Sequence, residues 1–150
     1  MKIYATLADL AADQGKEIGV SDWLQVTQER INQFADATDD HQWIHVDPER
    51  TKAELGMETI AHGYLTLSLI PHFTTQIFEV KSLKRLINLG ANKIRFSGVV
   101  PVNSRIRARV TLSKAVLSQS SLRTVSEFKV EREGTAKPVA TAEIITIFYE

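Results

Sequence analysis

The sequence contains no cysteine among its 150 residues. A disulfide framework, a thiolate metal site and a cysteine nucleophile are therefore excluded. The sequence also lacks an excess of charge of either sign, because 18 basic residues balance 18 acidic residues. A neutral chain creates no overall field that attracts nucleic acid or an anionic membrane surface, so we expect neither as a partner. The first residues lack the apolar core of a signal peptide, which favours the cytoplasm.

The length of the chain predicts a single domain over residues 1–150. A domain of this size buries roughly 68–70% of the surface that its unfolded chain exposes. It therefore needs neither a disulfide nor a metal to hold a core. The composition, 43% hydrophobic and 24% charged, is typical of a globular protein.

Helical patterns dominate the first half of the chain. Thr27 is a suitable N-cap for a helix that ends near Thr38, because apolar residues follow it at helical spacing. Asp47 and Pro48 predict the cap and the first position of a second, shorter helix over residues 48–55. The stretch 39–45 therefore falls just beyond the end of the first helix.

A third helical segment, residues 61–78, carries no Asp, Glu, Lys or Arg. It is long enough to span a membrane, but seven of its residues are Thr, Ser, Gln or His. This composition indicates a helix buried inside a protein. Pro71 predicts a kink within it.

The second half of the chain changes to the period of a β-strand. Residues 105–112 alternate apolar and polar side chains, as in a strand with one solvated face. The other expected strands are residues 23–26, 92–96, 122–133 and 139–150, with a turn at 133–138. Helices followed by a run of strands predict an α+β fold with an antiparallel sheet wrapped around the apolar helix.

The segment "DDHQWIHVDPER", residues 39–50, is unusually rich in carboxylates and imidazoles. Asp40 and His45 together are able to move a proton in either direction at neutral pH. The alternative is structural, with Asp40 capping a neighbouring amide and His45 packed in the interior. His41 and His45 stand four residues apart, a spacing that would also suit a metal on a helix, but the sequence offers no obvious third ligand.

His62 and Gly63 lie at the start of the apolar helical segment. A helix N-terminus stabilises negative charge, and a glycine leaves its amide uncovered. The Gly63 amide is thus suited to hold a thioester oxygen as it becomes an enolate. The alternatives are that Gly63 only allows close packing and that His62 is only a packed residue.

Three segments resemble one known family: "FADATDDHQWIHVDPERTKAELG", "IAHGYLTLSLIP" and "NKIRFSGVVPVNSRIRARV". In this order they are similar to the MaoC-like dehydratases, also called (R)-specific enoyl-CoA hydratases, and above all to the nodulation-protein-N-like branch. The resemblance covers roughly residues 17–149. The family signature, an aspartate followed by an aliphatic residue and a histidine, corresponds here to Asp40, Ile44 and His45.

This resemblance implies a hot-dog fold, a homodimer and no metal or organic cofactor. It implies hydration of a trans-2-enoyl-CoA to an (R)-3-hydroxyacyl-CoA, with Asp40 and His45 as the catalytic pair. The sequence leaves open which of the two takes the proton from water, and we expect both to hold the same water, with Asp40 as its main base. The sequence departs from the family where a glycine often precedes the aspartate, because Asp39 stands there. Gln42 and Trp43 replace the usual asparagine and proline, and we expect Gln42 to orient a partner.

Basic residues on the predicted strands are candidates for contacts with the phosphates of coenzyme A. Arg95 is the first candidate because it adjoins an apolar strand core. The alternative is that these side chains only form a solvated face. The candidates are Arg95, Arg105, Arg107 and Arg109.

Two further functions compete with the hydratase. One is a hot-dog acyl-CoA thioesterase, although such enzymes usually lack this Asp–His spacing. The other is a non-catalytic module that binds acyl thioesters. The homodimer is expected for a separate reason, because the last strand is more apolar than one core face requires. The residues concerned are Ile144, Ile145, Ile147 and Phe148.

Overall fold

The computed structural model describes residues 1–150 as a sheet packed against a set of short helices. The helices are α1 (Leu7–Ala11), α2 (Gln28–Thr38), α3 (Trp43–Val46), α4 (Pro48–Leu55), α5 (Gly63–Ser68) and α6 (Ile70–Ile77). The strands are β1 (Lys2–Tyr4), β2 (Glu17–Val20), β3 (Leu24–Gln25), β4 (Phe78–Val80), β5 (Arg85–Phe96), β6 (Arg105–Leu117), β7 (Ser121–Arg132) and β8 (Ala140–Tyr149).

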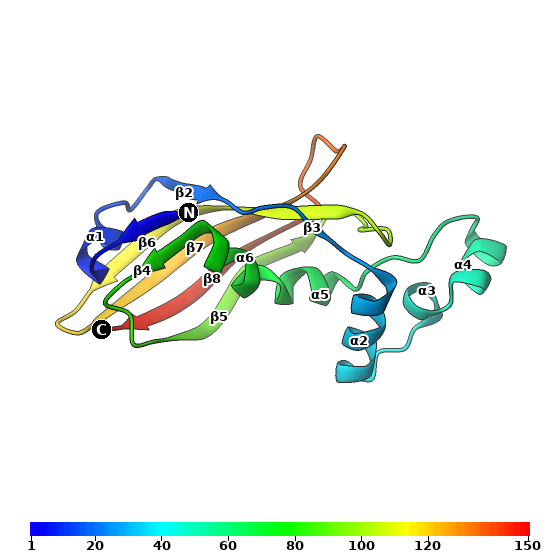
Figure 1. The fold of residues 1–150 in the computed structure, drawn as a ribbon, viewed down its shortest axis with the longest axis horizontal. Coiled ribbons are helices and arrows are strands. Elements are labelled where there is room, and N and C mark those ends of the chain that lie inside the picture. The colour runs from blue at the N-terminus through cyan, green and yellow to red at the C-terminus, as the bar shows by residue number, and fades with distance from the viewer.

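The four long strands β5 to β8 form most of one antiparallel sheet (Figure 1). The strand order is β2-β6-β7-β8-β5, and β3 also pairs with β6. Strand β5 therefore lies at one edge of the sheet, with β8 as its only partner. A separate parallel pair is formed by β1 and β4. The predicted α+β class with an antiparallel sheet is confirmed.

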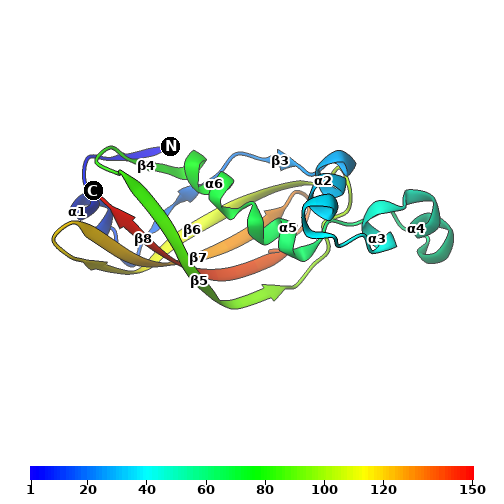
Figure 2. The same ribbon diagram turned by 90° about the horizontal axis from the view of Figure 1, so that it is seen from below.

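Helices α5 and α6 follow one another along one face of the sheet (Figure 2). They correspond to the apolar segment 61–78, which was predicted to be a buried, kinked helix. The interruption falls at Leu69, which ends α5 and caps α6. Pro71 explains it, because proline has no N–H for the carbonyl of the preceding turn. None of the helices is both long enough and apolar enough to span a membrane.

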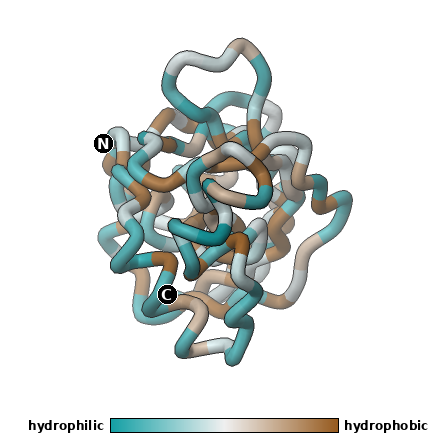
Figure 3. The backbone as a smooth tube through the Cα atoms, turned by 90° about the vertical axis from the view of Figure 1, so that its right-hand side faces the viewer, coloured by the Kyte–Doolittle hydropathy of each residue, from teal (hydrophilic) through white to brown (hydrophobic).

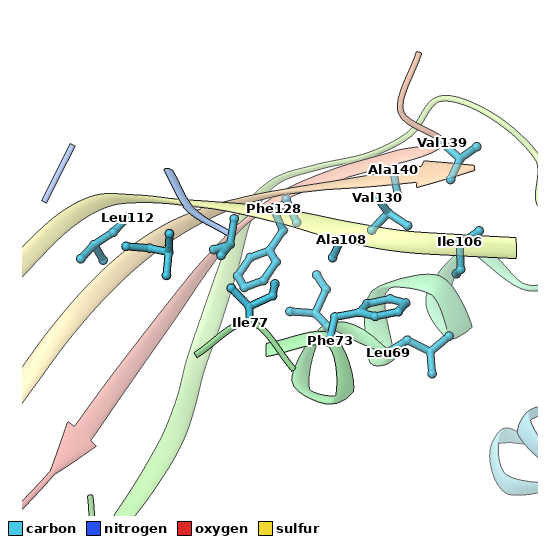
Figure 4. Close-up of a cluster of buried hydrophobic side chains, with 14 of the residues drawn as sticks. Leu69, Phe73, Ile77, Ile106, Ala108, Leu112, Phe128, Val130, Val139 and Ala140 are labelled. Carbon is cyan, nitrogen blue, oxygen red and sulfur yellow. The ribbon is translucent and has the colours of Figure 1, made fainter. Parts of the chain in front are cut away.

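The core lies between α6 and the inner face of the sheet. Phe73 is fully buried and Ile77 is nearly so. Both point from α6 toward the side chains of Ala108 and Phe128 on the sheet (Figure 4). Burying one such side chain stabilises the fold by about 1.5–3 kcal/mol. Seen along the long axis, hydrophobic stretches of the backbone gather toward the middle and hydrophilic ones toward the rim (Figure 3).

Helices α2, α3 and α4 project beyond one end of the sheet (Figures 1 and 2). Both predicted caps are confirmed: the Thr27 side chain accepts from the Arg30 amide, and the Asp47 side chain accepts from the Arg50 amide. The chain returns from this overhang to the sheet just before α5. The overhang therefore brings residues 39–45 to the start of the central helices.

Several short strands were not expected from the sequence, namely β1, β2 and β4. Each has three or four residues, so periodicity has little to act on. Strand β5 begins at Arg85, seven residues before the expected start at Asn92. Bulges between Asn88 and Gly90 and between Asn92 and Arg95 interrupt its alternation, which hides the strand pattern.

Candidate active site

The segment that carries Asp40 begins with a sharp reversal at the end of α2. Asp39 is the C-cap and adopts a left-handed conformation, with φ of 58° and ψ of 21°. Glycine adopts this conformation without a steric penalty, and aspartate is among the few other residues that tolerate it. This left-handed backbone explains why the family that the chain resembles often has a glycine at the position of Asp39.

His45 is buried, and its orientation is set by one hydrogen bond. Its Nδ1 lies 2.7 Å from the carbonyl oxygen of Ile60. Since a carbonyl only accepts, Nδ1 carries the proton and Nε2 keeps a free lone pair. Burial lowers the pKa of His45 below its ordinary value, and the hydrogen bond to Ile60 offsets this only in part. The ring is thus neutral at neutral pH, with a basic nitrogen available.

His62 is 2% exposed and packs directly against this ring. The two imidazoles stack with their centroids 3.8 Å apart. The Nε2 of His62 donates to the backbone carbonyl of Asp40 across 3.0 Å, and it lies 3.9 Å from the carboxylate oxygen Oδ2. His62 therefore anchors the Asp40 segment to the start of α5. Its Nδ1 is buried without a hydrogen-bond partner.

The structure thus brings together Asp40, His45 and His62. One atom of each residue that could ligate a metal, a carboxylate oxygen or a ring nitrogen, lies within 4.8 Å of those of the other two. The Asp40 side chain is about half exposed, at 53%, whereas both imidazoles are buried. Such a set is also able to ligate a metal. However, the His62 nitrogen nearest the Asp40 carboxylate is the one that donates to the Asp40 carbonyl, so it has no lone pair to offer there.

His41 does not join this cluster. Its Nε2 lies 2.9 Å from the carboxylate of Asp36, and this hydrogen bond raises the pKa of His41. The side chain is exposed and packs near α2. His41 and His45 therefore do not form the metal site that their spacing suggested.

Gln28, which no sequence pattern indicated, connects the segments that hold His45. Its Nε2 donates to the backbone carbonyl of His45 across 2.7 Å. Its Oε1 accepts from the hydroxyl of Thr59 at 2.5 Å, and Thr59 is fully buried. Because Thr59 precedes Ile60, this one side chain links α3 to the segment whose carbonyl orients the His45 ring. The link joins residues 31 positions apart, so no local pattern reveals it.

Gly63 begins α5 beside a cavity of about 340 Å³ that His45 also lines. The N–H groups of a first helical turn have no partner within the helix, so they are available to a ligand. A Cβ atom at Gly63 would lie 2.9 Å from the ring of Phe96. The packing reason for glycine is therefore real, and it coexists with an uncovered amide. Thr66 also lines this cavity, and neither it nor Phe96 was expected.

The other predicted site residues, Gln42 and Arg95, do not line this cavity. Gln42 precedes α3 as its N-cap and is exposed, and its side chain makes no capping hydrogen bond. Arg95 is exposed and donates to the carbonyl of its neighbour Ile94. It precedes Phe96, which lines the cavity, so by strand alternation it points to the opposite face.

The arginines of β6 form ion pairs on the outer face of the sheet. Arg107 and Arg109 share the carboxylate of Glu131, and Arg105 pairs with Glu133. The guanidinium of Arg107 also lies over the Trp23 ring, 4.4 Å from its centre. These contacts agree with the alternative that the sequence left open, a solvated and internally paired face.

Comparisons with known proteins point in one direction. A family model described as "MaoC like domain" matches residues 9–134. The 3-hydroxyacyl-thioester dehydratase Z of Mycobacterium tuberculosis is 49% identical over 146 residues, which cover 97% of each chain. Nodulation protein N of Rhizobium leguminosarum bv. viciae is 41% identical over 145 residues, covering 95% of this chain and 90% of its own.

Solved structures share the architecture. The unliganded "R-Hydratase PhaJ1" of Pseudomonas aeruginosa gives a TM-score of 0.76 at 20% identity, covering 98% of this chain and 87% of that chain. The "(R)-hydratase from A. caviae involved in PHA biosynthesis" gives a TM-score of 0.67 at 22% identity, covering 89% and 97%. At these identities the likeness shows the fold alone, and it confirms the predicted hot-dog fold.

Proposed function

Because this chain belongs to the MaoC-like dehydratase family, we propose that it reversibly hydrates a trans-2-enoyl-CoA to an (R)-3-hydroxyacyl-CoA. The observation that carries the proposal is the cluster of Asp40, His45 and His62, of which His45 lines the cavity beside Gly63. It combines an exposed carboxylate, a buried neutral imidazole with a free lone pair, and a third group that fixes both. These are the parts that general acid–base chemistry on water requires.

The spacing of the cluster suits a single water held by two groups. Hydrogen bonds to oxygen are about 2.8 Å long, so one water is able to bridge acceptors up to about 5.6 Å apart. A carboxylate oxygen of Asp40 and a ring nitrogen of His45 lie within 4.8 Å of each other. Both acceptors would therefore contact the same water and direct its oxygen lone pair toward the substrate.

The proton balance follows from the reaction. The water oxygen forms a bond to the β-carbon of the enoyl thioester and gives one proton to the pair, with Asp40 as the main base. Electrons of the double bond move toward the thioester oxygen, which becomes an enolate. The pair returns one proton to the α-carbon, so Asp40 and His45 end the cycle in their starting states. The dehydration is the same sequence in reverse.

The enolate oxygen needs a donor, and the amide of Gly63 is our candidate. Removing one preorganised donor of this kind typically costs roughly 10²–10³ in kcat. The stacked His62 ring and the Phe96 ring border the same region and would keep bulk water out. We also propose that Gln42 contacts the remainder of the coenzyme A thioester. Arg95 points to the other face of β5, so we propose it only as a contact for the phosphates where coenzyme A extends beyond the cavity.

The homodimer is part of this proposal, with a revised location. Strand β8 is an inner strand, paired on both sides, so it offers no edge to a partner. Strand β5 is an open edge and displays large exposed apolar side chains. An exposed apolar edge strand is a template for pairing with a second chain. The side chains concerned are Leu86, Ile87, Leu89 and Phe96.

One assay separates the three candidate functions. Crotonyl-CoA is followed by the absorbance of its conjugated thioester, together with a thiol reagent. A hydratase removes the absorbance without releasing thiol, and chiral analysis of the product then shows whether the (R) alcohol is formed. A thioesterase releases thiol. A binding module does neither, although calorimetry still detects association. Release of thiol, or binding without turnover, would overturn the proposal.

A further inference from the structure

Thr66, on α5, is the one helical threonine whose hydroxyl has no partner within the protein. Its side chain neither donates nor accepts a hydrogen bond. A helical threonine often bonds a carbonyl three or four residues back, because its Oγ1 reaches that far. The other threonines within helices all make this bond, namely Thr38, Thr51, Thr74 and Thr75. The Thr66 hydroxyl therefore remains available to a partner outside the chain.

The free hydroxyl of Thr66 faces the cavity beside Gly63. Thr66 is only 3% exposed, and it lines this cavity. The side-chain atoms that are fully buried without a partner are His62 Nδ1 and Gln76 Oε1. The Thr66 hydroxyl is not one of these atoms, so it keeps some accessible surface, and that surface opens into the cavity. A ligand in the cavity is thus able to satisfy it.

The polar side chains that line the cavity differ in what they have left to offer. The Ser97 hydroxyl already donates to the carbonyl of Pro138 across 2.8 Å. His45 donates from Nδ1 to Ile60, so its other nitrogen only accepts. Thr66 is therefore the only side chain of the lining with a hydrogen-bond donor still free.

The position of Thr66 on α5 places this donor beside the amide of Gly63. Residues three apart on a helix are neighbours on one face, with about 5–6 Å between their Cβ positions. The Cα–Cβ bond of a helical residue tilts toward the N-terminus, so the Thr66 side chain leans over the turn that Gly63 begins. Two donors that share one acceptor span up to about 5.7 Å. One oxygen atom is therefore able to accept from both groups.

Building on the proposed function, we propose that the Thr66 hydroxyl is a second donor to the thioester oxygen, alongside the amide of Gly63. The hydroxyl keeps its proton and donates a hydrogen bond as the electrons of the double bond move onto this oxygen. Such a bond is stronger to the enolate than to the neutral thioester, because a charged acceptor strengthens it. It therefore stabilises the transition state more than the bound substrate.

A purely structural role for Thr66 makes a different prediction for stability. Thr66→Val keeps the branched shape and removes only the hydroxyl. Because the hydroxyl has no partner within the protein, its removal should leave the urea midpoint of unfolding unchanged or raise it. A lower midpoint combined with a parent-like kcat would show that the hydroxyl serves the fold, and it would overturn the proposal.

The kinetic test uses hydration of crotonyl-CoA. Thr66→Val should lower kcat roughly 10–10²-fold, the range for one hydrogen bond to a developing charge, with little change in KM. Thr66→Ser keeps a hydroxyl and should keep most of the activity. Thr75→Val is the matched control, because it removes a helical hydroxyl that donates to the His72 carbonyl, and it should keep the parent rate. A parent-like kcat in Thr66→Val, or an equal loss in Thr66→Ser, would overturn the proposal.

Infrared spectroscopy reports on the bond itself. Crotonyl-CoA labelled with carbon-13 at the thioester carbonyl is bound to Asp40→Asn, in which slow turnover preserves the substrate. Hydrogen bonds to the carbonyl oxygen weaken the C=O bond and lower its stretching frequency. Adding Thr66→Val should move the frequency back toward that of free crotonyl-CoA, whereas adding Thr66→Ser should not. Identical bands with threonine and valine at this position would overturn the proposal.

Failure of the proposed function has a separate signature, which is absence of crotonyl-CoA hydration by the parent protein. The carbonyl band of crotonyl-CoA bound to the parent protein and to Thr66→Val then decides the question. A higher frequency in Thr66→Val supports Thr66 as a donor to the thioester oxygen even without turnover. An unchanged frequency, or no binding of crotonyl-CoA by calorimetry, overturns this role.

Discussion

The rings of His45 and His62 lie face to face, with centroids 3.8 Å apart and planes inclined by 26°. Both rings are buried, and each donates one N–H to a backbone carbonyl. Two imidazoles this close resist being protonated together, because like charges would be buried side by side. The stack therefore keeps His45 neutral while fixing its orientation.

This relationship predicts the pH dependence of activity. The free lone pair of His45 is lost on protonation, and burial and the neighbouring His62 both lower the pKa of His45. The acid limb of kcat/KM should therefore lie below the ordinary histidine pKa of about 6.5. In His62→Phe the stack persists without the second charge, so the pKa of His45 should rise and the limb should move to higher pH. A limb that stays in place would contradict this.

The same pKa shift has a consequence for stability. Where the folded pKa of a histidine is depressed, the unfolded chain binds more protons between the folded and unfolded pKa values. The free energy of unfolding should then increase with pH across this window. The stability that the buried, neutral His45 contributes should be lost as the pH falls through the window. Urea unfolding of the parent and of His45→Gln at several pH values measures the effect. The variant should lose this part of the pH dependence.

Substitutions of the pair itself test the proposed chemistry. Asp40→Asn keeps the size and shape but accepts a proton poorly, and His45→Gln removes the imidazole. Each should lower kcat by roughly 10²–10⁴-fold. The double variant should lose far less than the product of the two, since residues that act as one unit are not additive. Asp40→Asn that is folded by circular dichroism, yet hydrates crotonyl-CoA at the parent rate, would refute the pair.

The matched control for these variants is His41→Gln. His41 pairs with Asp36 outside the cluster, so most of the activity should remain. Addition of a chelator should also leave the rate unchanged if the cluster acts on water without a metal. Loss of activity with chelator, and its recovery with a divalent cation, would instead identify Asp40, His45 and His62 as a metal site.

Gln28 is predicted to act on catalysis through His45 without touching the substrate. Gln28→Leu leaves the His45 carbonyl and the buried Thr59 hydroxyl without their partner, which should cost about 1–3 kcal/mol of stability. It should lower kcat roughly tenfold with little change in KM, because orientation and not binding is lost. Gln28→Glu keeps an acceptor for Thr59 and should restore stability more than kcat. Gln33→Leu, on the exposed face of the same helix, should change neither.

The extent to which the sequence predicts this protein differs between local and long-range features. The caps at Thr27 and Asp47, the buried helical segment and the strand alternation of 105–112 follow from local chemistry, and all were confirmed. The His62–Asp40 and Gln28–Thr59 contacts join residues 22 and 31 positions apart, so only the folded chain reveals them. Only residues 92–96 of strand β5 were predicted, because bulges break the two-residue period of the strand.

The proposed homodimer contact can be tested at the open edge of the sheet. Ile87 is 47% exposed on the open edge strand β5 and does not line the cavity beside Gly63. Ile87→Lys should shift light-scattering mass from dimer to monomer, because an edge lysine opposes strand pairing. Lys114→Gln on β6, an exposed inner strand position, is the control. A parent protein that is monomeric at micromolar concentration would refute the dimer itself.

Asp39 offers a last test, of the turn that delivers Asp40 to the cluster. Its positive φ costs an ordinary residue roughly 1–2 kcal/mol, which glycine avoids and aspartate tolerates. Asp39→Gly removes this strain but gives the unfolded chain more freedom, worth about 0.4–1 kcal/mol, so stability should change little. Asp39→Val places a β-branched residue in the same conformation and should lose about 1–2 kcal/mol of stability or shift the turn.

If the turn positions Asp40, Asp39→Val should also lower kcat, whereas Asp39→Gly should keep the parent kcat. Chemical unfolding and crotonyl-CoA hydration measure both. Equal activity of the two variants would show that Asp40 is positioned by the His62 hydrogen bond alone, independently of the left-handed turn.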